Sequence, residues 1–411
     1  MKIICARDAL LEAVNLMSAV VPARTPAPAL SCLKLNATKQ GGVGYLQITG
    51  TDADTSLELN LTQVDISQPG VAVISAEKLR QIIQAFDPRE KTVTLELEND
   101  TCHIRAQHSR FRVFAFNPAD YPPVPSFNPA TGVANARAQF AQSVGTFSRL
   151  INRTMFATAK ETSRYAINGV LLKRDGKKIE MVATDGRRLA LCRATAKVAS
   201  ETPVSCIIPT KALSLFTRLA GNPESAVRVA ITDNRIFFAF DDAEMSEAKD
   251  AKDAKKDAKD GKDAKPSLPP RAVLSSTLVE GAFPPYDDVI PKDQDKKATA
   301  SRDELISAVR QASVLTNEES RGIRMAFSGK DKSVKLSSRA PELGDSEIDL
   351  GLAGYEGEDL EICFNPHFFS DVLKALDEPE IVIEFKAPNK PGVLKAGADF
   401  LYVLMPVNLP T

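Results

Sequence analysis

Three stretches of the chain repeat one pattern of apolar and polar positions. Residues 74–86 (ISAEKLRQIIQAF), 208–220 (IPTKALSLFTRLA) and 364–376 (FNPHFFSDVLKAL) each open on an apolar residue. A helix-start signal follows, and then apolar side chains recur at helical spacing. In the third stretch, Asn365 is the expected N-cap and Pro366 suits the first helical position. The pattern therefore predicts three equivalent helices.

A second amphipathic helix is expected ahead of each of these three. Residues 6–21, 144–154 and 301–315 space their apolar side chains three or four apart. In the last of them, Ser301 and Glu304 have the spacing of a capping box. The expected apolar faces consist of Leu10, Val14, Met17 and Val21 in the first helix, and of Val144, Phe147 and Leu150 or Ile151 in the second.

The rest of each repeat alternates apolar and polar residues. Residues 46–61 (LQITGTDADTSLELNL) and 92–107 (TVTLELENDTCHIRAQ) show this alternation, interrupted by turn residues. It is typical of antiparallel strands joined by hairpins. The sequence therefore predicts an α+β fold in which one unit, two helices plus antiparallel sheets, occurs three times.

The repeat distance supports the duplication and exposes an insertion. Thr184-Asp185 follows Thr51-Asp52 by 133 residues, and the helical stretches that begin at 74 and 208 are 134 residues apart. The third helical stretch follows 156 residues later, and residues 244–265 (EMSEAKDAKDAKKDAKDGKDAK) account for the excess. This tract balances seven lysines against seven acidic residues and has no apolar face, so we expect a solvated excursion from a hairpin. A DNA-tethering arm is the alternative interpretation.

Proline-rich stretches mark the expected boundaries between repeats. NPADYPPVPSFNP spans 117–129 and FPPYDDVIPKD spans 283–293. The predicted domains are residues 1–128, residues 129–296 with the insertion at about 244–270 in a hairpin loop, and residues 297–411.

Composition excludes several classes of protein. The 411 residues carry a formal net charge of −1, so any contact with DNA must come from local patches. The six cysteines form no CxxC pair, which favours reduced thiols in a cytoplasmic protein, and we expect no metal even at Cys102-His103. No signal peptide or stretch of about 20 apolar residues occurs, so no membrane association is expected. Walker A, GxSxG and HExxH motifs are also lacking, so neither catalytic residues nor a cofactor are expected.

One hairpin carries an unusual pair of charges. In MVATDGRRLALC (181–192), Asp185-Gly186 is a turn signal between two apolar runs. Arg187 and Arg188 follow directly, so two adjacent cations are expected just past the hairpin tip, beside apolar surface.

Five motifs together resemble one known family. They are RYAINGVLLK (164–173), VATDGRRLA (182–190), FPPYDDVIP (283–291), NEESRGIRM (317–325) and YVLMPVNL (402–409). In order and spacing they are similar to those of the bacterial DNA polymerase III beta subunits, the beta sliding clamps. The resemblance covers the chain apart from the insertion.

The resemblance implies a head-to-tail homodimeric ring of clamp domains whose helices line a hole for double-stranded DNA. Such a ring is a non-catalytic processivity factor that tethers the replicative polymerase catalytic subunit. A clamp loader opens it, and other polymerases and repair proteins bind it through short linear motifs.

The resemblance also implies three sets of site residues. The partner-motif cleft would comprise Ile167, Thr184, Gly186, Arg187, Arg188, Leu189, Pro284, Val289, Val403, Leu404, Met405, Pro406 and Val407. The DNA contacts would be Arg24, Arg164 and Tyr165, with Lys78, Arg80, Arg149 and Lys211 as candidate inner cations on the repeat helices. The dimer seam would pair Phe111 and Val113 with Val314 and Leu315.

Two departures from the family pattern bear on the partner motif. Asp287-Asp288 stands where family members often carry a basic pair, and Asn408 replaces the usual cation near the end of the chain. We therefore expect a partner peptide to tolerate a basic flank.

Two other interpretations of the sequence stay open: a repeat scaffold that binds peptides without encircling DNA, and an enzyme on a β-rich scaffold.

Overall fold

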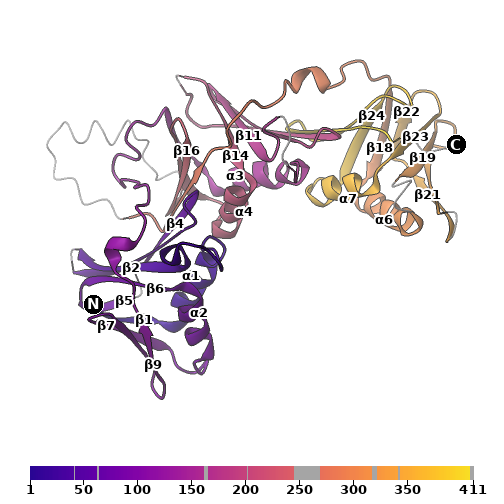
Figure 1. The fold of residues 1–411 in the computed structure, drawn as a ribbon. Coiled ribbons are helices and arrows are strands. Elements are labelled where there is room, and N and C mark those ends of the chain that lie inside the picture. The colour runs from indigo at the N-terminus through magenta and orange to yellow at the C-terminus, as the bar shows by residue number, and fades with distance from the viewer. Residues whose placement is uncertain are drawn as a thin grey trace. The chain divides into compact units, whose positions relative to one another are not determined.

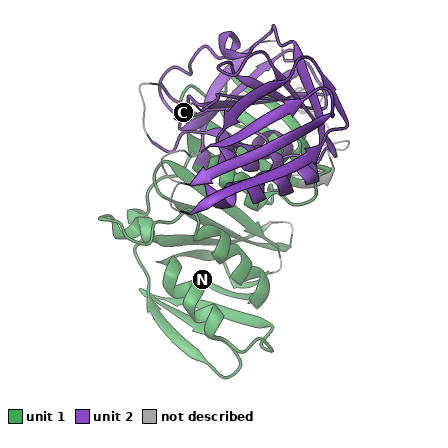
Figure 2. Cartoon of the chain, turned by 90° about the vertical axis from the view of Figure 1, so that its right-hand side faces the viewer, with its two compact units in different colours: residues 1–148, 211–278 green, residues 149–210, 279–411 purple. Residues whose placement is uncertain are grey.

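The computed structural model describes most of the chain as two compact units. The described residues are 1–40, 42–62, 64–161, 165–200, 202–244, 269–316, 322–340 and 343–407. Unit 1 consists of residues 1–148 and 211–278, and unit 2 of residues 149–210 and 279–411 (Figure 2). Residues 245–265 of the predicted excursion, Arg164 and Asn408 lie outside the described residues.

Unit 1 contains two antiparallel sheets (Figure 1). The larger has the strand order β10 (Ala138–Ser143), β15 (Ser225–Ile231), β16 (Arg235–Glu244), β17 (Ala272–Thr277), β4 (Thr55–Leu61), β3 (Val43–Thr51), β2 (Cys32–Gln40) and β6 (Gly70–Ser75). The smaller has the order β5 (Val64–Gln68), β1 (Lys2–Ala6), β7 (Thr92–Glu98), β8 (Thr101–Arg105) and β9 (Arg110–Phe114).

Unit 2 repeats this arrangement with other strands. The larger sheet has the order β14 (Val204–Pro209), β11 (Gly169–Asp175), β12 (Lys178–Thr184), β13 (Arg188–Thr195), β26 (Phe400–Leu404), β25 (Gly392–Ala396), β24 (Glu380–Phe385), β18 (Lys296–Ser301) and β22 (Gly354–Glu356). The smaller has the order β21 (Gly344–Gly351), β20 (Ser333–Ala340), β19 (Ile323–Ser328) and β23 (Leu360–Phe364).

Six α-helices occur among the described residues, two for each predicted repeat. They are α1 (Arg7–Met17), α2 (Ala76–Ala85), α3 (Val144–Asn152), α4 (Thr210–Leu219), α6 (Arg302–Ala312) and α7 (Pro366–Lys374). The short 3₁₀ turns are η1 (Pro28–Ser31), η2 (Pro118–Asp120), η3 (Met155–Ala157), η4 (Asp287–Val289) and η5 (Ser313–Leu315). The predicted α+β fold of repeated helix pairs with antiparallel sheets is confirmed. No described helix is both long and apolar enough to cross a membrane.

The helix starts follow local sequence at two positions and depart from it at a third. Asn365 Oδ1 accepts the N–H of His367 at 2.9 Å, as predicted, and Ser75 caps α2 in the same way. The capping box at Ser301 is wrong, because the Ser301 side chain makes no cap hydrogen bond. Ser301 is also the last residue of β18, and the carbonyl of Pro379 accepts the N–H of Arg302, so tertiary contacts replace the local cap.

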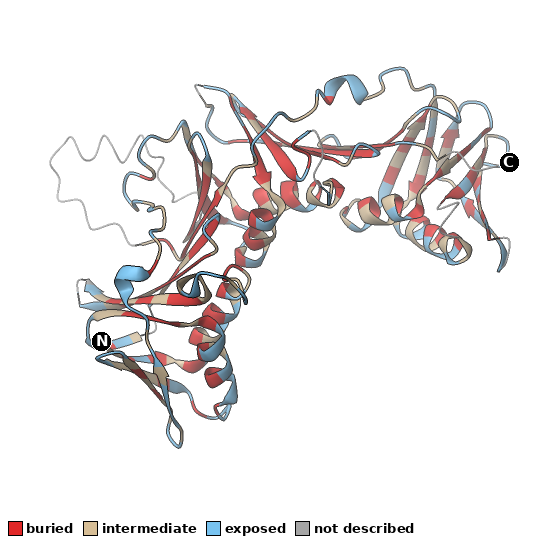
Figure 3. Cartoon of the chain, in the orientation of Figure 1, coloured by how far each residue is buried: buried red, intermediate tan, exposed pale blue. Residues whose placement is uncertain are grey.

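Apolar helix faces form the core of each unit (Figure 3). Leu10, Val14 and Met17 are fully buried on the predicted face of α1. In unit 1, the ring of Phe216 lies 5.0 to 5.5 Å from those of Phe147, Phe238 and Phe240. In unit 2, the core contains the fully buried side chains of Phe364, Phe369, Phe385 and Tyr402.

The cysteines are free thiols, as expected. Five are buried and Cys363 is partly buried. Burial raises the pKa of Cys5 to about 12 and those of Cys102 and Cys192 to about 11. These three thiols stay protonated at neutral pH, as befits core side chains rather than nucleophiles.

Candidate functional site

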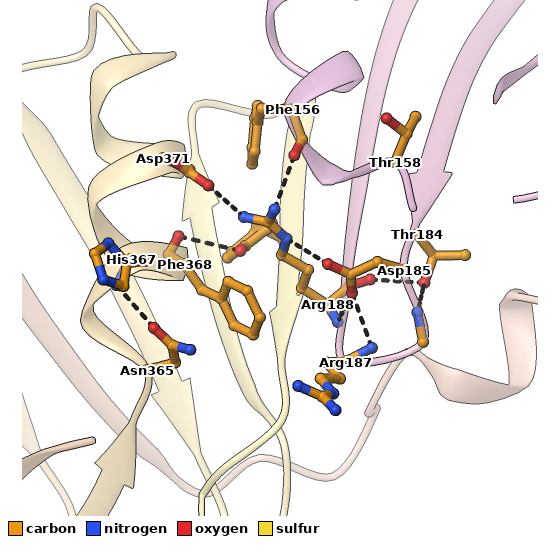
Figure 4. Close-up of polar contacts among 12 residues, drawn as sticks. Phe156, Thr158, Thr184, Asp185, Arg187, Arg188, Asn365, His367, Phe368 and Asp371 are labelled. Carbon is orange, nitrogen blue, oxygen red and sulfur yellow. Dashed lines mark hydrogen bonds and ion pairs between the residues drawn. The ribbon is translucent and has the colours of Figure 1, made fainter. Parts of the chain in front are cut away.

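The tip of the β12–β13 hairpin is a tightly hydrogen-bonded turn (Figure 4). Thr184 Oγ1 donates to the carbonyl of Arg188 at 2.6 Å and accepts the N–H of Gly186 at 3.1 Å. Asp185 Oδ1 accepts the N–H groups of Arg187 and Arg188 at 3.0 and 3.1 Å. Gly186 has φ +86°, a conformation that glycine adopts without steric cost. The predicted turn is present, and its polar side chains hold it shut.

The same turn recurs 133 residues earlier, in unit 1. Thr51 Oγ1 bonds the carbonyl of Thr55 at 3.0 Å and accepts the N–H of Ala53 at 3.1 Å. Asp52 Oδ1 accepts the N–H groups of Asp54 and Thr55. Ala53 has φ +83°, close to the value at Gly186. The repeat found in the sequence is therefore a repeat of backbone geometry and hydrogen bonding.

Exchanging the residues at the two positive-φ positions should have opposite effects on stability. We expect Gly186→Ala to cost about 1 kcal/mol, because a Cβ in the left-handed region is strained although nothing crowds it. Ala53→Gly should relieve the same strain and be neutral or stabilise by up to about 1 kcal/mol. Urea unfolding of both variants measures this, and destabilisation of equal size in both would contradict it.

The two tip arginines have different environments. Arg187 is exposed, whereas Arg188 is only 9% exposed. Arg188 donates from Nε to Asp185 at 2.9 Å, from Nη1 to Asp371 at 2.7 Å and from Nη2 to the carbonyl of Phe156 at 2.9 Å. Burial lowers its pKa, but the hydrogen bond to Asp371 and neighbouring groups outweigh this and raise it overall. Arg188 thus remains a buried cation neutralised by carboxylates.

Three residues that contact Arg188 were not predicted from the sequence. Asp371 and Phe368 come from α7, and Phe156 comes from η3. The Arg188 guanidinium lies 4.4 Å from the centre of the Phe368 ring, a cation–π contact. Residues 368 and 371 are three apart and share a helix face, but nothing in the sequence indicates that this face meets the hairpin.

An apolar cluster lies beneath the hairpin. It consists of the buried residues Ala166, Leu171, Val182, Leu189, Leu191, Ile207, Tyr286 and Val403, with Val279, Phe283, Ile290 and Leu401 packed against it. Leu189 pairs with Val403 across β13 and β26, and the N–H of Met405 donates to the carbonyl of Arg187 at 3.0 Å. The C-terminal residues are therefore fastened to the hairpin tip.

The thirteen residues of the expected cleft divide by exposure. Ile167, Thr184, Arg188, Leu189, Val403 and Leu404 are buried and form the support. Pro284, Pro406 and Val407 are partly exposed. Gly186 and Arg187 are exposed, as are Val289 at 48% and Met405 at 40%. We call these last four residues the tip surface.

Acidic residues flank the tip surface. Asp287 and Asp288 are exposed in η4, next to the buried Tyr286. Lys173 Nζ donates to the Tyr286 hydroxyl at 3.2 Å. That hydrogen bond raises the pKa of Lys173, with a smaller contribution from Asp287. The acidic pair that stands in place of the expected basic pair is therefore exposed to solvent.

The candidate DNA-contacting residues differ in their ion pairs, hydrogen bonds and exposure. Lys211 pairs with Asp52, and Arg149 pairs with Asp399 at 3.2 Å. Lys78 and Arg80 donate to Gln81 and Gln84 of their own helix. Arg24 and Tyr165 are exposed. Lys211 and Arg149 therefore present less net charge than expected.

Phe111 and Val113, two of the candidate seam residues, lie on an end strand of one smaller sheet, whereas Val314 and Leu315 lie in η5. In unit 1, β9 is an end strand with Phe111 and Phe114 exposed, and Phe111 also packs edge-on against Phe86 at 5.7 Å. In unit 2, β21 is an end strand, and a Cβ on its first residue, Gly344, would lie 3.9 Å from Leu315. Val113 is partly exposed, and Val314, next to Leu315, is 72% exposed.

The two end strands carry opposite charge. Arg110 and Arg112 are exposed on β9. Asp345, Glu347 and Asp349 occupy alternate positions of β21.

Within the described ranges, no three His, Cys, Asp or Glu side chains are grouped as a metal site would require.

Comparisons with known proteins agree along the chain. Residues 1–125, 142–248 and 287–408 match the sequence profiles of the N-terminal, central and C-terminal domains of the DNA polymerase III beta subunit. The chain is 29% identical over 405 residues to the beta sliding clamp of Pseudomonas putida, covering 98% of each chain. It is 28% identical over 412 residues to that of Escherichia coli K12, covering all of both. A crystal structure of the Pseudomonas aeruginosa DNA polymerase III subunit beta matches the whole of both chains, with a TM-score of 0.83 and 27% identity.

Proposed function

The chain belongs to the family of DNA polymerase III beta subunits, the bacterial beta sliding clamps, and on that premise we propose how it holds DNA and partners. As a beta sliding clamp it is a processivity factor of DNA replication and a non-catalytic polymerase subunit. Two copies close head to tail around double-stranded DNA, and the tip surface receives short motifs of partner proteins. The match of all three domain profiles in chain order is the observation that carries this proposal.

The proposed clamp domains are residues 1–128, 129–296 and 297–411. The first two profile matches fall inside the first two ranges, and the third begins at residue 287, within the proline-rich stretch. Each proposed domain contributes one helix pair: α1 with α2, α3 with α4, and α6 with α7.

DNA is held by enclosure, with few strong contacts. The formal net charge of −1 disfavours tight binding to phosphate, and weak salt-sensitive contacts permit sliding. Among the described residues, Arg24, Lys78, Tyr165 and Lys211 are proposed contacts with exposed side chains. Lys211 contributes less, because Asp52 neutralises it. Arg164 remains a proposed contact on the resemblance alone.

Partner motifs are bound at the tip surface by apolar anchors and one cation. Met405 and Val289 offer exposed apolar side chains beside the buried cluster, and methionine adapts to differently shaped partners. Arg187 offers an exposed guanidinium for a polar or acidic residue of the motif. The proposed partners are the replicative polymerase catalytic subunit, the clamp loader, and other polymerases and repair proteins with such motifs.

The acidic flank should alter the preference for residues beside the motif. We expect a fluorescein-labelled peptide with Leu-Phe anchors to bind about threefold tighter with two lysines than with two glutamates in the flank outside the residue directly before the anchors, because Asp287 and Asp288 are exposed. Fluorescence anisotropy measures both affinities. The Asp287→Asn/Asp288→Asn variant should lose the difference, and equal affinities for the native chain would contradict the prediction.

The proposed dimer seam joins β9 of one copy to β21 of the other. Both are end strands, and an unpaired end strand as apolar as β9 otherwise invites aggregation. Phe111, Val113, Val314 and Leu315 supply the apolar part. The arginines of β9 and the carboxylates of β21 supply charge complementarity.

Retention on circular DNA tests the function directly. The purified chain is incubated with nicked circular duplex, its clamp loader and ATP, and the DNA-bound fraction is isolated by gel filtration. We expect the chain to stay on circular DNA and to be lost when a restriction enzyme linearises it. Equal retention on linear DNA, or none on circular DNA, would favour the non-encircling scaffold.

A further inference from the structure

The two arginines at the hairpin tip are adjacent in sequence, but one is exposed and the other is buried. We propose that Asp371 is a positioning residue that immobilises Arg188, so that Arg187 alone selects the charge of the partner's motif. This inference rests on the proposed function of the tip surface. It adds a residue of α7, far along the chain, that determines specificity without touching the partner.

The contacts of Arg188 leave it little capacity to bind a ligand. Each of its three nitrogens already donates to a protein oxygen: Asp185, Asp371 and the carbonyl of Phe156. One face of the guanidinium lies against the Phe368 ring. Two carboxylates face one cation, so its charge is neutralised within the protein.

The two carboxylates that hold Arg188 are not equivalent. Asp185 also accepts the two N–H groups that close the turn, so its removal would change the hairpin itself. Asp371 lies on α7 and bonds the guanidinium from outside the turn (Figure 4). Its side chain is 42% exposed, so losing it would also open a path from solvent to Arg188. Asp371 is therefore the residue whose loss frees Arg188 while the turn stays closed.

Freeing Arg188 would add a second cation beside Arg187. A partner with an acidic residue would then meet two guanidinium groups instead of one. The preference for acidic over neutral motifs would rise, whereas a purely structural role for Asp371 would lower the affinity for both motifs alike. The selectivity ratio thus separates positioning from simple support.

The first experiment needs no partner. The full-length chain is treated with phenylglyoxal, which modifies accessible guanidinium groups, and modified peptides are quantified by mass spectrometry. We expect Arg187 to react and Arg188 to be protected in the native chain. In Asp371→Asn, Arg188 should react about tenfold faster, and Asp371→Glu should restore most of the protection.

Asp399→Asn is the matched control. Asp399 also pairs with an arginine of unit 2, Arg149, but it makes no hydrogen bond to the hairpin tip. Arg188 should stay protected in this variant. Rapid modification of Arg188 in the native chain, or unchanged protection in Asp371→Asn, would overturn the inference even if motif binding is demonstrated.

The second experiment measures selectivity by fluorescence anisotropy. Two fluorescein-labelled peptides end in Leu-Phe and differ only in Asp or Asn directly before these anchors. We expect the native chain to prefer the Asp peptide about threefold and Arg187→Gln to show no preference. In Asp371→Asn the preference should rise to about tenfold.

The failures of the two proposals are distinguishable. If neither peptide binds the native chain but the phenylglyoxal pattern is as expected, the partner-binding role of the tip surface fails, while the immobilisation of Arg188 by Asp371 stands. If both peptides bind and the ratio in Asp371→Asn equals that of the native chain, the positioning role is overturned and the proposed function stands.

Discussion

Reversing the charge of either end strand is expected to leave the chain monomeric, and mixing the two reversed variants is expected to restore dimers. The variants are Arg110→Glu/Arg112→Glu in β9 and Asp345→Lys/Glu347→Lys in β21. Each alone places like charges across both seams of a dimer, at a cost on the order of 3 kcal/mol per seam, or more than a hundredfold in dissociation constant. A mixed dimer has one native seam and one with both signs exchanged. Sedimentation velocity at micromolar concentration measures the masses.

Controls separate the seam from a general effect of charge. Arg137 is an exposed cation of unit 1 that lies off β9 and pairs with Asp233 at 3.6 Å. Arg137→Glu should therefore leave the mass unchanged. Salt should weaken the native dimer, because exposed charge pairs are screened. If the variants alone stay dimeric, or the mixture stays monomeric, the seam between β9 and β21 is wrong.

Removing Arg153 is expected to destabilise unit 2 by about 3 kcal/mol. The residue is 4% exposed, and its Nη2 lies 2.8 and 3.0 Å from the two carboxylate oxygens of Glu378. Its guanidinium also lies 6.0 Å from the centre of the Phe400 ring. Deleting one partner of a buried pair costs about 3–5 kcal/mol, and the partial exposure of Glu378 places Arg153→Ala at the lower end. Urea unfolding measures the change in free energy.

Arg149→Ala is the matched control for this prediction. Arg149 lies one helical turn earlier and pairs with Asp399, but both side chains are substantially exposed. Its removal should cost less than about 1 kcal/mol. Equal losses for the two variants would show that burial does not determine the strength of these pairs.

Lowering the pH should reduce the stabilisation that the Arg153–Glu378 pair contributes to unit 2. Burial raises the pKa of Glu378, but backbone hydrogen bonds and Arg153 outweigh this, and the net pKa lies below its ordinary value. The stabilisation is therefore fully present above the unfolded-state pKa of about 4.3 and is lost as the pH falls through the lowered value.

Local patterns predicted the elements well where neighbours in sequence determine them. The six helices lie where apolar spacing placed them, and the cap at Asn365 formed because its partner is two residues away. The turn at Thr184 could be predicted because its hydrogen-bond partners lie two to four residues apart. The capping box at Ser301 failed because Ser301 ends β18 and the carbonyl of Pro379 accepts the N–H of Arg302, so residues distant in sequence determine this helix start.

The different environments of Arg187 and Arg188 could not be predicted from the sequence. Both are cations past a hairpin tip, and no local pattern distinguishes them. The distinction comes from Asp371, which is 183 residues from Arg188, and from the facing ring of Phe368. Burial of a charge depends on what the fold brings to it, and the resemblance to relatives named neither residue.

The arginines of β9 and the carboxylates of β21 give the two proposed seam strands of one chain opposite charge. A head-to-tail contact that closes leaves neither β9 nor β21 free, whereas one that does not close always leaves one β9 and one β21 exposed. Further copies then add to either terminus without limit, as in a fibre. Closure of the proposed two-copy ring would therefore also prevent polymerisation at the concentrations of a crowded cell.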